Sequence, residues 1–208
     1  SGAIGYLPQN LASQRTARVA DLCGIGAKLD ALRSIESGDV DPQLFETLEE
    51  CWDVESRALA NLSAAGLGGI GLARPVSSLS GGEAITAALV GLRLGDHEIS
   101  LLDEPTNNLD REARQQLYEA ILDWPGTLLV ASPDVELLDL MDDIAELRTG
   151  SLAKFGGNYD SFRNNIEKEQ LAAQRALGAA QQKLKTEKKQ RIEAQTKMAR
   201  RLRYARTE

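Results

Sequence analysis

Two carboxylates, Asp103 and Glu104, directly follow the short apolar run at residues 101–102, and such a pair suits magnesium-dependent phosphoryl chemistry. If the run is a strand of a parallel sheet, its carboxyl end lies at the edge where ligands of α/β folds bind. Asp103 can hold Mg²⁺ through a water molecule, because Mg²⁺ keeps much of its hydration shell. Glu104 can then polarise a second water for attack on a γ-phosphate. Solvated acids also end ordinary strands, so the pair by itself is a weak signal.

A second candidate site is the segment LSGGE at residues 79–83, which we expect to begin a helix. Backbone N–H groups at a helix N-terminus bind anions, glycines allow close approach, and the Ser80 hydroxyl adds a donor. An ordinary serine-capped helix has the same residues. The order and spacing of the two motifs are more informative, because LSGGE ends 20 residues before Asp103 in the run DEPTNNLD.

The elements that must position these residues alternate between helix and strand, which indicates an α/β fold. Apolar spacing predicts one helix from residue 16 to 35 and another from 42 to about 65, the second opened by Asp41 and Pro42. We also expect helices at 80–94 and 111–122, a short strand at 5–9, buried strands at 99–102 and 127–131, and a hairpin at 145–155 turning at Thr149-Gly150. The long helical stretch between the first two strands predicts an inserted helical subdomain.

Composition bounds the class of protein. The 208 residues suffice for one domain with an extension, and 42% hydrophobic content is ordinary for a soluble protein. No apolar run approaches the roughly 18 residues that a membrane span needs, and the N-terminus lacks a signal-peptide pattern. Cys23 and Cys51 fit no metal-binding spacing, and we expect reduced thiols of a cytosolic protein.

Charge divides the chain at about residue 157. Residues 1–157 carry 11 Lys/Arg and 25 Asp/Glu, a net charge of −14, whereas residues 158–208 carry 13 and 6, a net charge of +7. An acidic globule with a basic tail suggests that the tail meets an anionic partner, although a helix that is only solvated has the same composition. The tail lacks proline and has a thin apolar stripe, which predicts a long helix that needs a partner helix and is compatible with a homo-oligomer.

Taken together, the motifs resemble those of the ATP-binding cassette (ABC) ATPases. The resemblance rests on Gln9 in GYLPQ, on LSGGE, on SLLDEPTNNLD at residues 100–110 and on TLLVAS at residues 127–132. It implies an α/β fold, namely a partial ABC ATPase cassette over residues 1–157 with a helical subdomain at about 10–94 and part of the parallel core sheet at 95–157. It also implies ATP and Mg²⁺ as cofactors and ATP hydrolysis by the intact protein.

The resemblance implies a role for each motif. Gln9 matches the Q-loop glutamine, which approaches the magnesium and the attacking water. Asp103 matches the Walker B aspartate that serves the metal, and Glu104 matches the catalytic glutamate. The remaining positions act across a pair of cassettes, where the signature closes on ATP held by the opposite cassette and the D-loop communicates between them. They are Ser80, Gly81, Gly82 and Glu83 for the signature, and Leu109 and Asp110 for the D-loop.

Two positions depart from the family pattern. A histidine usually follows the last core strand, and here the sequence reads Ser132-Pro133-Asp134. Because proline cannot donate a hydrogen bond to a γ-phosphate, Pro133 at this switch position predicts slow or asymmetric hydrolysis. The same residues also make a sound helix start, with Ser132 as N-cap and Pro133 at the first position. The second departure is Ala84, where a basic residue is common.

The phosphate-binding Walker A loop, G-x-x-x-x-G-K-[ST], requires a Gly-Lys pair, and the sequence has none. The family places this loop before the Q-loop strand, at which this chain begins. We therefore expect a fragment, made by truncation or proteolysis, with negligible ATPase activity by itself. A native protein without the loop is the alternative.

The segment GNYDSF at residues 157–162, followed directly by the basic helix, narrows the resemblance to the ABC-F family, as does DEPTNNLD with Asn108 where histidine is usual. In that family a linker of long helices, here residues 158–208, leads to a second cassette of the same polypeptide. The resemblance implies a cytoplasmic protein without membrane insertion that acts on the ribosome in translation or antibiotic resistance. Residues of the linker that would face RNA are Lys183, Lys185, Lys188, Lys189, Arg191, Lys197, Arg200, Arg201, Arg203 and Arg206.

Two other hypotheses stay open. A nucleotide-binding subunit of an ABC membrane transporter shares the core motifs but gives no reason for the basic helix, and a non-catalytic fragment would use the helical subdomain and tail only to bind partners. Two further patterns carry no predicted function. GLGGIG at residues 66–71 matches a dinucleotide fingerprint but follows a helix, and His97 is the only histidine, so zinc is not expected.

Overall fold

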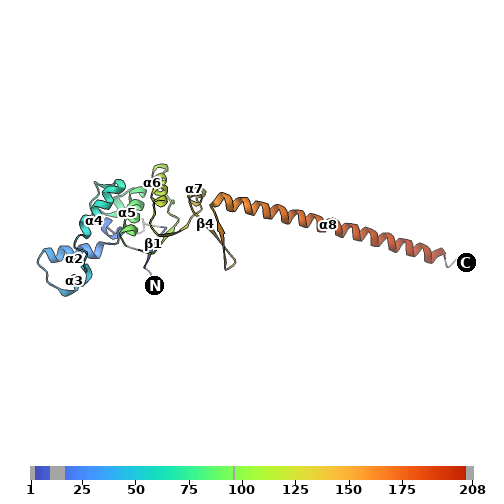
Figure 1. Ribbon diagram of the computed structural model, residues 1–208, viewed down its shortest axis with the longest axis horizontal. Coiled ribbons are helices and arrows are strands. Elements are labelled where there is room, and N and C mark those ends of the chain that lie inside the picture. The colour runs from blue at the N-terminus through green and yellow to red at the C-terminus, as the bar shows by residue number, and fades with distance from the viewer. Residues whose placement is uncertain (1–2, 10–16, 96, 205–208) are drawn as a thin grey trace. The chain divides into compact units, whose positions relative to one another are not determined.

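A computed structural model describes residues 3–9, 17–95 and 97–204 of the chain. The chain forms two compact units, Ser1–Leu140 and Met141–Glu208, and the boundary predicted at residue 157 falls inside the second. The first unit contains a small parallel sheet and the helical subdomain, and the second contains a hairpin and one long helix (Figure 1).

The sheet of the first unit has three parallel strands in the order β1-β2-β3. The strands are β1 (Ile4–Leu7), β2 (Ile99–Asp103) and β3 (Thr127–Ala131). The helical subdomain connects β1 to β2, and α6 (Arg111–Leu122) connects β2 to β3. Parallel strands end at the same edge of the sheet, so the segments that follow all three strands meet there. The predicted strands and their α/β arrangement are confirmed.

Short helices around one apolar core make up the helical subdomain. They are α1 (Val19–Leu22), α2 (Gly26–Glu36), α3 (Pro42–Leu48), α4 (Val54–Leu62) and α5 (Gly81–Leu94), with a π-helical turn at Ser63–Leu67 and a 3₁₀ turn at Val76–Ser78. Leu29, Leu48 and Leu62 are fully buried and belong to one cluster with Val19 and Ala87. Residues 10–16, predicted to begin this subdomain, lie outside the described residues.

Two helices that the sequence predicted as continuous are broken by residues with left-handed backbone. The predicted helix 16–35 is interrupted between α1 and α2, where Gly24 has a φ of +69°. The predicted helix 42–65 is interrupted after α3, where Glu49 has a φ of +51°. Apolar spacing hides both breaks, because the helices on either side of each bury their apolar residues in the same core.

Within the described residues, only one face of the sheet is covered. Alternate strand residues point to opposite faces. The buried set is Gly5, Leu7, Ser100 and Leu102. The exposed set is Ile4, Tyr6, Ile99 and Leu129. The strands at 99–102 and 127–131 were predicted to be buried, and this prediction holds for one face of β2 alone.

The second unit is a hairpin followed by one long helix. The strands β4 (Asp143–Arg148) and β5 (Ser151–Gly156) pair antiparallel around Thr149 and Gly150, which both have positive φ, as the sequence predicted. The helix α8 (Tyr159–Tyr204) has 46 residues and starts with Phe162 packed on Phe155, their ring centroids 4.9 Å apart. The predicted long helix is confirmed, and its leucines at 171, 177 and 184 are each more than half exposed.

Candidate nucleotide site

Asp103 is the last residue of β2, at the carboxyl edge of the sheet where the sequence predicted it. The Tyr6 hydroxyl donates a 3.2 Å hydrogen bond to Asp103 Oδ2. Loss of solvation and this bond to a carboxylate raise the pKa of Tyr6, which keeps the phenol protonated and able to donate. The bond therefore orients the Asp103 carboxylate at the end of its strand.

Glu104 has a left-handed backbone, with a φ of +46°, immediately before Pro105. That conformation is unfavourable for a residue with a side chain, and a following proline disfavours it further. The Glu104 N–H donates a 2.7 Å hydrogen bond to the Ala131 carbonyl, and the Glu104 carbonyl accepts one of 3.0 Å from Asn107 N–H. These bonds hold a strained turn at the residue predicted to be catalytic, as is common at functional sites.

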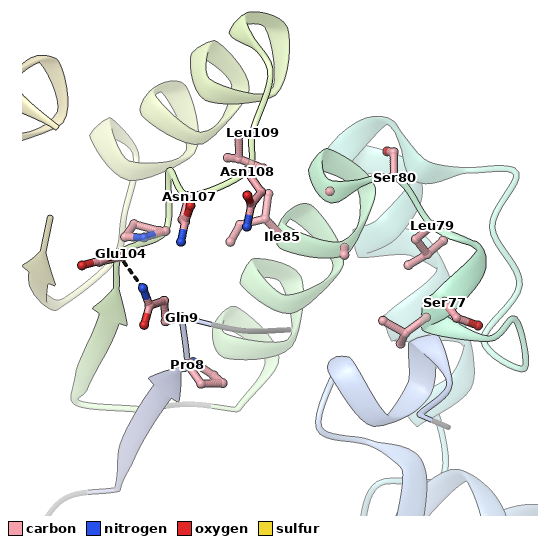
Figure 2. Close-up of a pocket in the computed structure, with 14 residues that line it drawn as sticks. Pro8, Gln9, Ser77, Leu79, Ser80, Ile85, Glu104, Asn107, Asn108 and Leu109 are labelled. Carbon is pink, nitrogen blue, oxygen red and sulfur yellow. Dashed lines mark hydrogen bonds between the residues drawn. The ribbon is translucent and has the colours of Figure 1, made fainter. Parts of the chain in front are cut away.

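Gln9 meets Glu104 directly. Its amide nitrogen donates a 2.6 Å hydrogen bond to Glu104 Oε2 (Figure 2). Both residues lie on one side of a pocket of about 660 Å³, and Leu79 and Ser80 lie on the other (Figure 2). The structure thus brings the predicted Q-loop, catalytic and signature residues to one pocket, although β1 and β2 are far apart in sequence.

Ser80 is the N-cap of α5, as the sequence predicted. Its hydroxyl oxygen accepts a 3.2 Å hydrogen bond from Glu83 N–H, and Glu83 Oε2 accepts one of 2.7 Å from Ser80 N–H. The bond from the Ser80 backbone lowers the pKa of Glu83, so the carboxylate stays ionised in this capping box. Glu83 therefore interacts with both the backbone and the side chain of Ser80 at the start of α5.

The two signature glycines allow α5 to approach the turn after Glu104. A β-carbon at Gly81 would lie 3.1 Å from the Asn108 carbonyl oxygen, and one at Gly82 would lie 2.8 Å from the Ala113 β-carbon. The sequence analysis assigned these glycines to the approach of an anion. The structure adds a second requirement, since any side chain here would push α5 away from α6.

Leu109 and Asp110 join that turn to α6. Leu109 is buried, and its side chain would be 3.7 Å from a β-carbon at Gly81. Asp110 is the N-cap of α6, with Oδ1 accepting a 2.9 Å hydrogen bond from Ala113 N–H. The predicted D-loop therefore links the signature helix to α6 within this chain.

Pro133 lies in the turn after β3, and the helix that follows begins later than predicted. The N-cap of α7 (Val135–Leu138) is Asp134, whereas the sequence analysis considered Ser132. Asp134 Oδ1 accepts hydrogen bonds from the first backbone N–H groups of α7, and Oδ2 accepts one of 2.8 Å from the Tyr118 hydroxyl. Burial and the Asp134 bond raise the pKa of Tyr118 to about 12. Ser132 instead accepts from Asp134 N–H, so the predicted N-cap was wrong.

A second cavity of about 330 Å³ places Pro133 beside Glu104. Among the described residues that line it, Arg114 carries the only positive charge, and its guanidinium lies 3.8 Å from Asp134. Pro133, at the predicted switch position, therefore lines the same cavity as Glu104, the residue predicted to be catalytic, and a proline offers no hydrogen-bond donor.

Comparison with known proteins shows which families this chain is similar to. No protein-family model matches the sequence. The chain is 35% identical over 134 residues to the Escherichia coli K12 protein named "Probable ATP-binding protein YheS", covering 64% of the chain and 21% of that protein. It is 40% identical over 116 residues to the energy-dependent translational throttle protein EttA of Mycobacterium tuberculosis H37Rv, covering 54% and 20%. It is 32% identical over 137 residues to ABC transporter F family member 2 of Arabidopsis thaliana, covering 64% and 20%.

Over the matched region, the chain is similar to ABC-F ATP-binding proteins. It spans about a fifth of the length of these curated relatives.

Solved structures bear out the fold of the chain. A nucleotide-free ATP-binding cassette from an ABC transporter superposes with a TM-score of 0.52 at 16% identity, covering 79% of the chain and 64% of that structure. A structure named RNase-L Inhibitor gives a TM-score of 0.50 at 23% identity, covering 81% and 30%. The predicted fold, a partial α/β ABC cassette with a long C-terminal helix, is confirmed.

The donor set of this candidate site fits the oxygen ligands that Mg²⁺ prefers. Mg²⁺ prefers oxygen ligands and keeps several waters, so it needs few protein ligands. Asp103, Glu104 and Gln9 supply carboxylate and amide oxygens at one sheet edge. Across the described residues no group of three His, Cys, Asp or Glu side chains forms a cage for a metal ion alone.

The residues predicted to face RNA lie on α8 as far as Arg203. The side chains of Lys183, Lys185, Lys188, Lys189 and Lys197 are exposed. Arg191, Arg200, Arg201 and Arg203 share the same helical backbone, and Arg206 lies outside the described residues. In the part of the chain that the structure describes, no helix combines the length and the apolar character of a membrane span.

Sequence reasoning missed two residues of the candidate site, Tyr6 and Arg114. Tyr6 reaches Asp103 because the strand register pairs Tyr6 with Leu101, which lies on the same face of β2 as Asp103. The register between two strands that are far apart in the chain cannot be predicted from a single sequence. Arg114 was more accessible to prediction, since it lies one helical turn after the N-cap Asp110 and so beside the same turn.

Proposed function

We propose that this chain supplies the hydrolytic carboxylates and the signature surface of an ATP-hydrolysing ABC-F protein. The observation that carries the proposal is the cluster at the sheet edge, where Gln9 donates a 2.6 Å hydrogen bond to Glu104 beside the metal candidate Asp103. The family relationship and the pocket that joins this cluster to Ser80 support it.

Each residue of the cluster has a separate task. Asp103 holds the hydrated metal, and its orientation is set by Tyr6. Glu104 accepts the proton of the attacking water. Gln9 fixes the Glu104 carboxylate through its amide nitrogen, which leaves its own oxygen for a metal-bound water. Bound Mg²⁺ would neutralise charge on the transferred phosphoryl group.

The signature serves a nucleotide held elsewhere. Ser80, Gly81 and Gly82 lie at the N-terminus of α5, which is 14 residues long and presents free N–H groups to an anion. We propose that this surface closes on ATP held by a second cassette of the same polypeptide. Because the 208-residue chain contains no Gly-Lys pair, we expect no measurable turnover from it alone.

Substitution of Glu104 in the full-length protein tests this proposal. Glu104→Gln keeps the size and the hydrogen bond to Gln9 but removes the proton acceptor, so single-turnover hydrolysis should fall about 100-fold or more. ATP binding, measured by equilibrium titration, should change little. The matched control is Glu119→Gln, which neutralises an exposed glutamate on α6 and should leave the rate unchanged.

Two outcomes would contradict the proposal. An unchanged rate in Glu104→Gln would exclude Glu104 as the proton acceptor, and turnover by purified residues 1–208 would remove the need for another phosphate loop. The same assay examines the switch position. Because Pro133 cannot donate to the γ-phosphate, Pro133→His should raise the single-turnover rate if hydrolysis here is slowed by that proline.

We further propose that the intact protein is a cytoplasmic translation factor whose α8 meets ribosomal RNA. The name of the relative EttA, an energy-dependent translational throttle protein, supports a role in translation. The exposed lysines of α8 support contact with a polyanion, since phosphate binding is mainly electrostatic.

A further inference from the structure

Two aromatic rings of the helical subdomain, Phe45 and Trp52, form an exposed pair. Their ring centroids are 6.1 Å apart, and the side chains are 40% and 52% exposed. The chain has only two tryptophans and three phenylalanines. Large aromatic side chains normally lie in a core or an interface, so this exposed pair requires an explanation.

The pair is held in place by the backbone between its members. Leu48 of α3 is fully buried and anchors the helix on the core. Glu49 then reverses the chain in a left-handed conformation that costs roughly 1–2 kcal/mol for a residue other than glycine. Its carboxylate is held 2.9 Å from Lys28 Nζ. A strained and anchored turn brings Trp52 back to Phe45, so the pair is a preorganised surface rather than a loose loop.

The surroundings of the pair are strongly acidic. Residues 36–55 contain eight Asp/Glu and no Lys/Arg. Basic residues outside this segment compensate three of these acids, since Lys28 pairs with Glu49, Arg33 with Glu55 and Arg57 with Asp53. Glu46 and Glu50, which flank the reversal on either side, are exposed. The charge of this surface repels a polyanion and attracts a cation.

The other tryptophan of the chain, Trp124, makes a contact with a cation. Trp124 is covered by the Arg93 guanidinium, whose carbon lies 5.2 Å from the ring centroid. Among the described contacts, no cation covers Trp52. A tryptophan face is the best aromatic acceptor for a guanidinium or ammonium group. Trp52 with acids beside it thus offers a cation site that the chain itself leaves open.

We propose that Phe45 and Trp52, with Glu46 and Glu50, bind a lysine- or arginine-rich segment of another protein. The cation stacks on Trp52, the carboxylates pair with its neighbours, and the apolar part of the segment packs on Phe45. This surface is separate from the nucleotide pocket, so the inference does not depend on ATP hydrolysis.

Binding of a labelled peptide to the 208-residue chain tests the inference. The probe is a short synthetic peptide in which arginine alternates with leucine, and fluorescence anisotropy gives its dissociation constant. Trp52→Ala should weaken binding about tenfold or more, as expected for an aromatic anchor. Trp52→Phe should lose less, because phenylalanine keeps the apolar contact but is a poorer cation acceptor. Glu46→Gln/Glu50→Gln should weaken binding severalfold, most strongly at low salt.

The control is Glu169→Gln/Glu187→Gln, which makes the same change of charge on exposed positions of α8 and should leave the dissociation constant unchanged. Circular dichroism shows whether each variant is folded. The inference fails if the surface variants bind the peptide as the parent does, or if the control weakens binding equally. It also fails if labelled oligouridine RNA binds the chain and loses affinity on Trp52→Ala, since that would make the surface an RNA site.

Discussion

The helical subdomain and α8 are both helical, yet they are stabilised by different means. In the helical subdomain, short helices such as α1 and α4 exist because Val19, Leu62 and their neighbours are buried in a common core. In α8, the side chains that the structure describes beyond the first turns are exposed, so the helix relies on local propensity and pairs such as Arg163 with Glu167. The proposed role of the first region depends on where its core places the side chains, and the proposed role of α8 depends on its charge.

Charge removal from α8 gives the largest expected effect. Replacing the exposed residues Lys183, Lys185, Lys188 and Lys189 with Gln should lower the affinity for single-stranded RNA by about tenfold to a hundredfold and flatten its salt dependence. Anisotropy titrations of labelled RNA at several KCl concentrations measure both. Neutralising Glu46 and Glu50 in the acidic region should not weaken RNA binding. If the salt dependence of RNA affinity were unchanged in the lysine variant, α8 would not bind RNA through its charge, and the contrast with the acidic region would fail.

Replacing glycine with alanine should change the stability of the two regions in opposite directions. A β-carbon at Gly91 in α5 would meet the backbone of Leu22 and Cys23 at 2.5–2.8 Å, so Gly91→Ala should destabilise the first unit by about 1–3 kcal/mol. A β-carbon at Gly178 in α8 meets nothing within 4 Å, so Gly178→Ala should stabilise that helix by about 0.5–1 kcal/mol.

Urea unfolding followed by tryptophan fluorescence reports on the first unit, which contains both tryptophans, and far-ultraviolet circular dichroism reports on α8. Equal effects of the two substitutions would show that α8 is packed as tightly as the subdomain and would contradict the comparison.

Acid sensitivity gives the smallest expected effect. Arg18 lies 3.0 Å from Asp21 and 2.8 Å from Asp30, and its hydrogen bonds lower the pKa of both carboxyl groups. A lowered folded-state pKa adds stability above the unfolded value near 4, and this stability is lost as the pH falls through the folded value. Arg18→Gln should therefore be less stable than the parent at pH 6, with the difference shrinking toward pH 3.

Urea titrations at several pH values measure this difference in the free energy of unfolding. Partial exposure and salt screening keep it small. The matched control is Arg163→Gln on α8, which should leave the unfolding of the first unit unaffected. A deficit in Arg18→Gln that persisted unchanged at pH 3 would assign the role of Arg18 to packing rather than to its ion pairs.

Local signals in the sequence predicted much of the fold. Ser80 as the cap of α5 and the turn at Thr149-Gly150 depend on neighbouring residues only. The break at Glu49 could not be predicted, because glutamate rarely adopts positive φ and does so here where the buried Leu48 and the Lys28 ion pair hold it. The exposure of one face of β3 could not be predicted either, because an apolar run does not tell which face of a strand is packed against other elements.

The candidate site divides in the same way. Asp103, Glu104 and Ser80 were found because each is defined by its motif. Tyr6 was missed because it depends on strand register, and the cap of α7 was misassigned because Tyr118, from another helix, selects Asp134 over Ser132. Contacts that arise from tertiary structure were therefore the ones that the sequence did not predict.

The aromatic contact between Phe155 and Phe162 has a mechanical consequence. It is the joint at the base of α8, whose 46 residues extend about 69 Å at 1.5 Å per residue. For a rigid rod of that length, a tilt of about 5° at the joint moves the far end by about 6 Å, by the same geometry. A tilt small enough to leave the ring contact intact would therefore displace the far end of α8 by several ångströms.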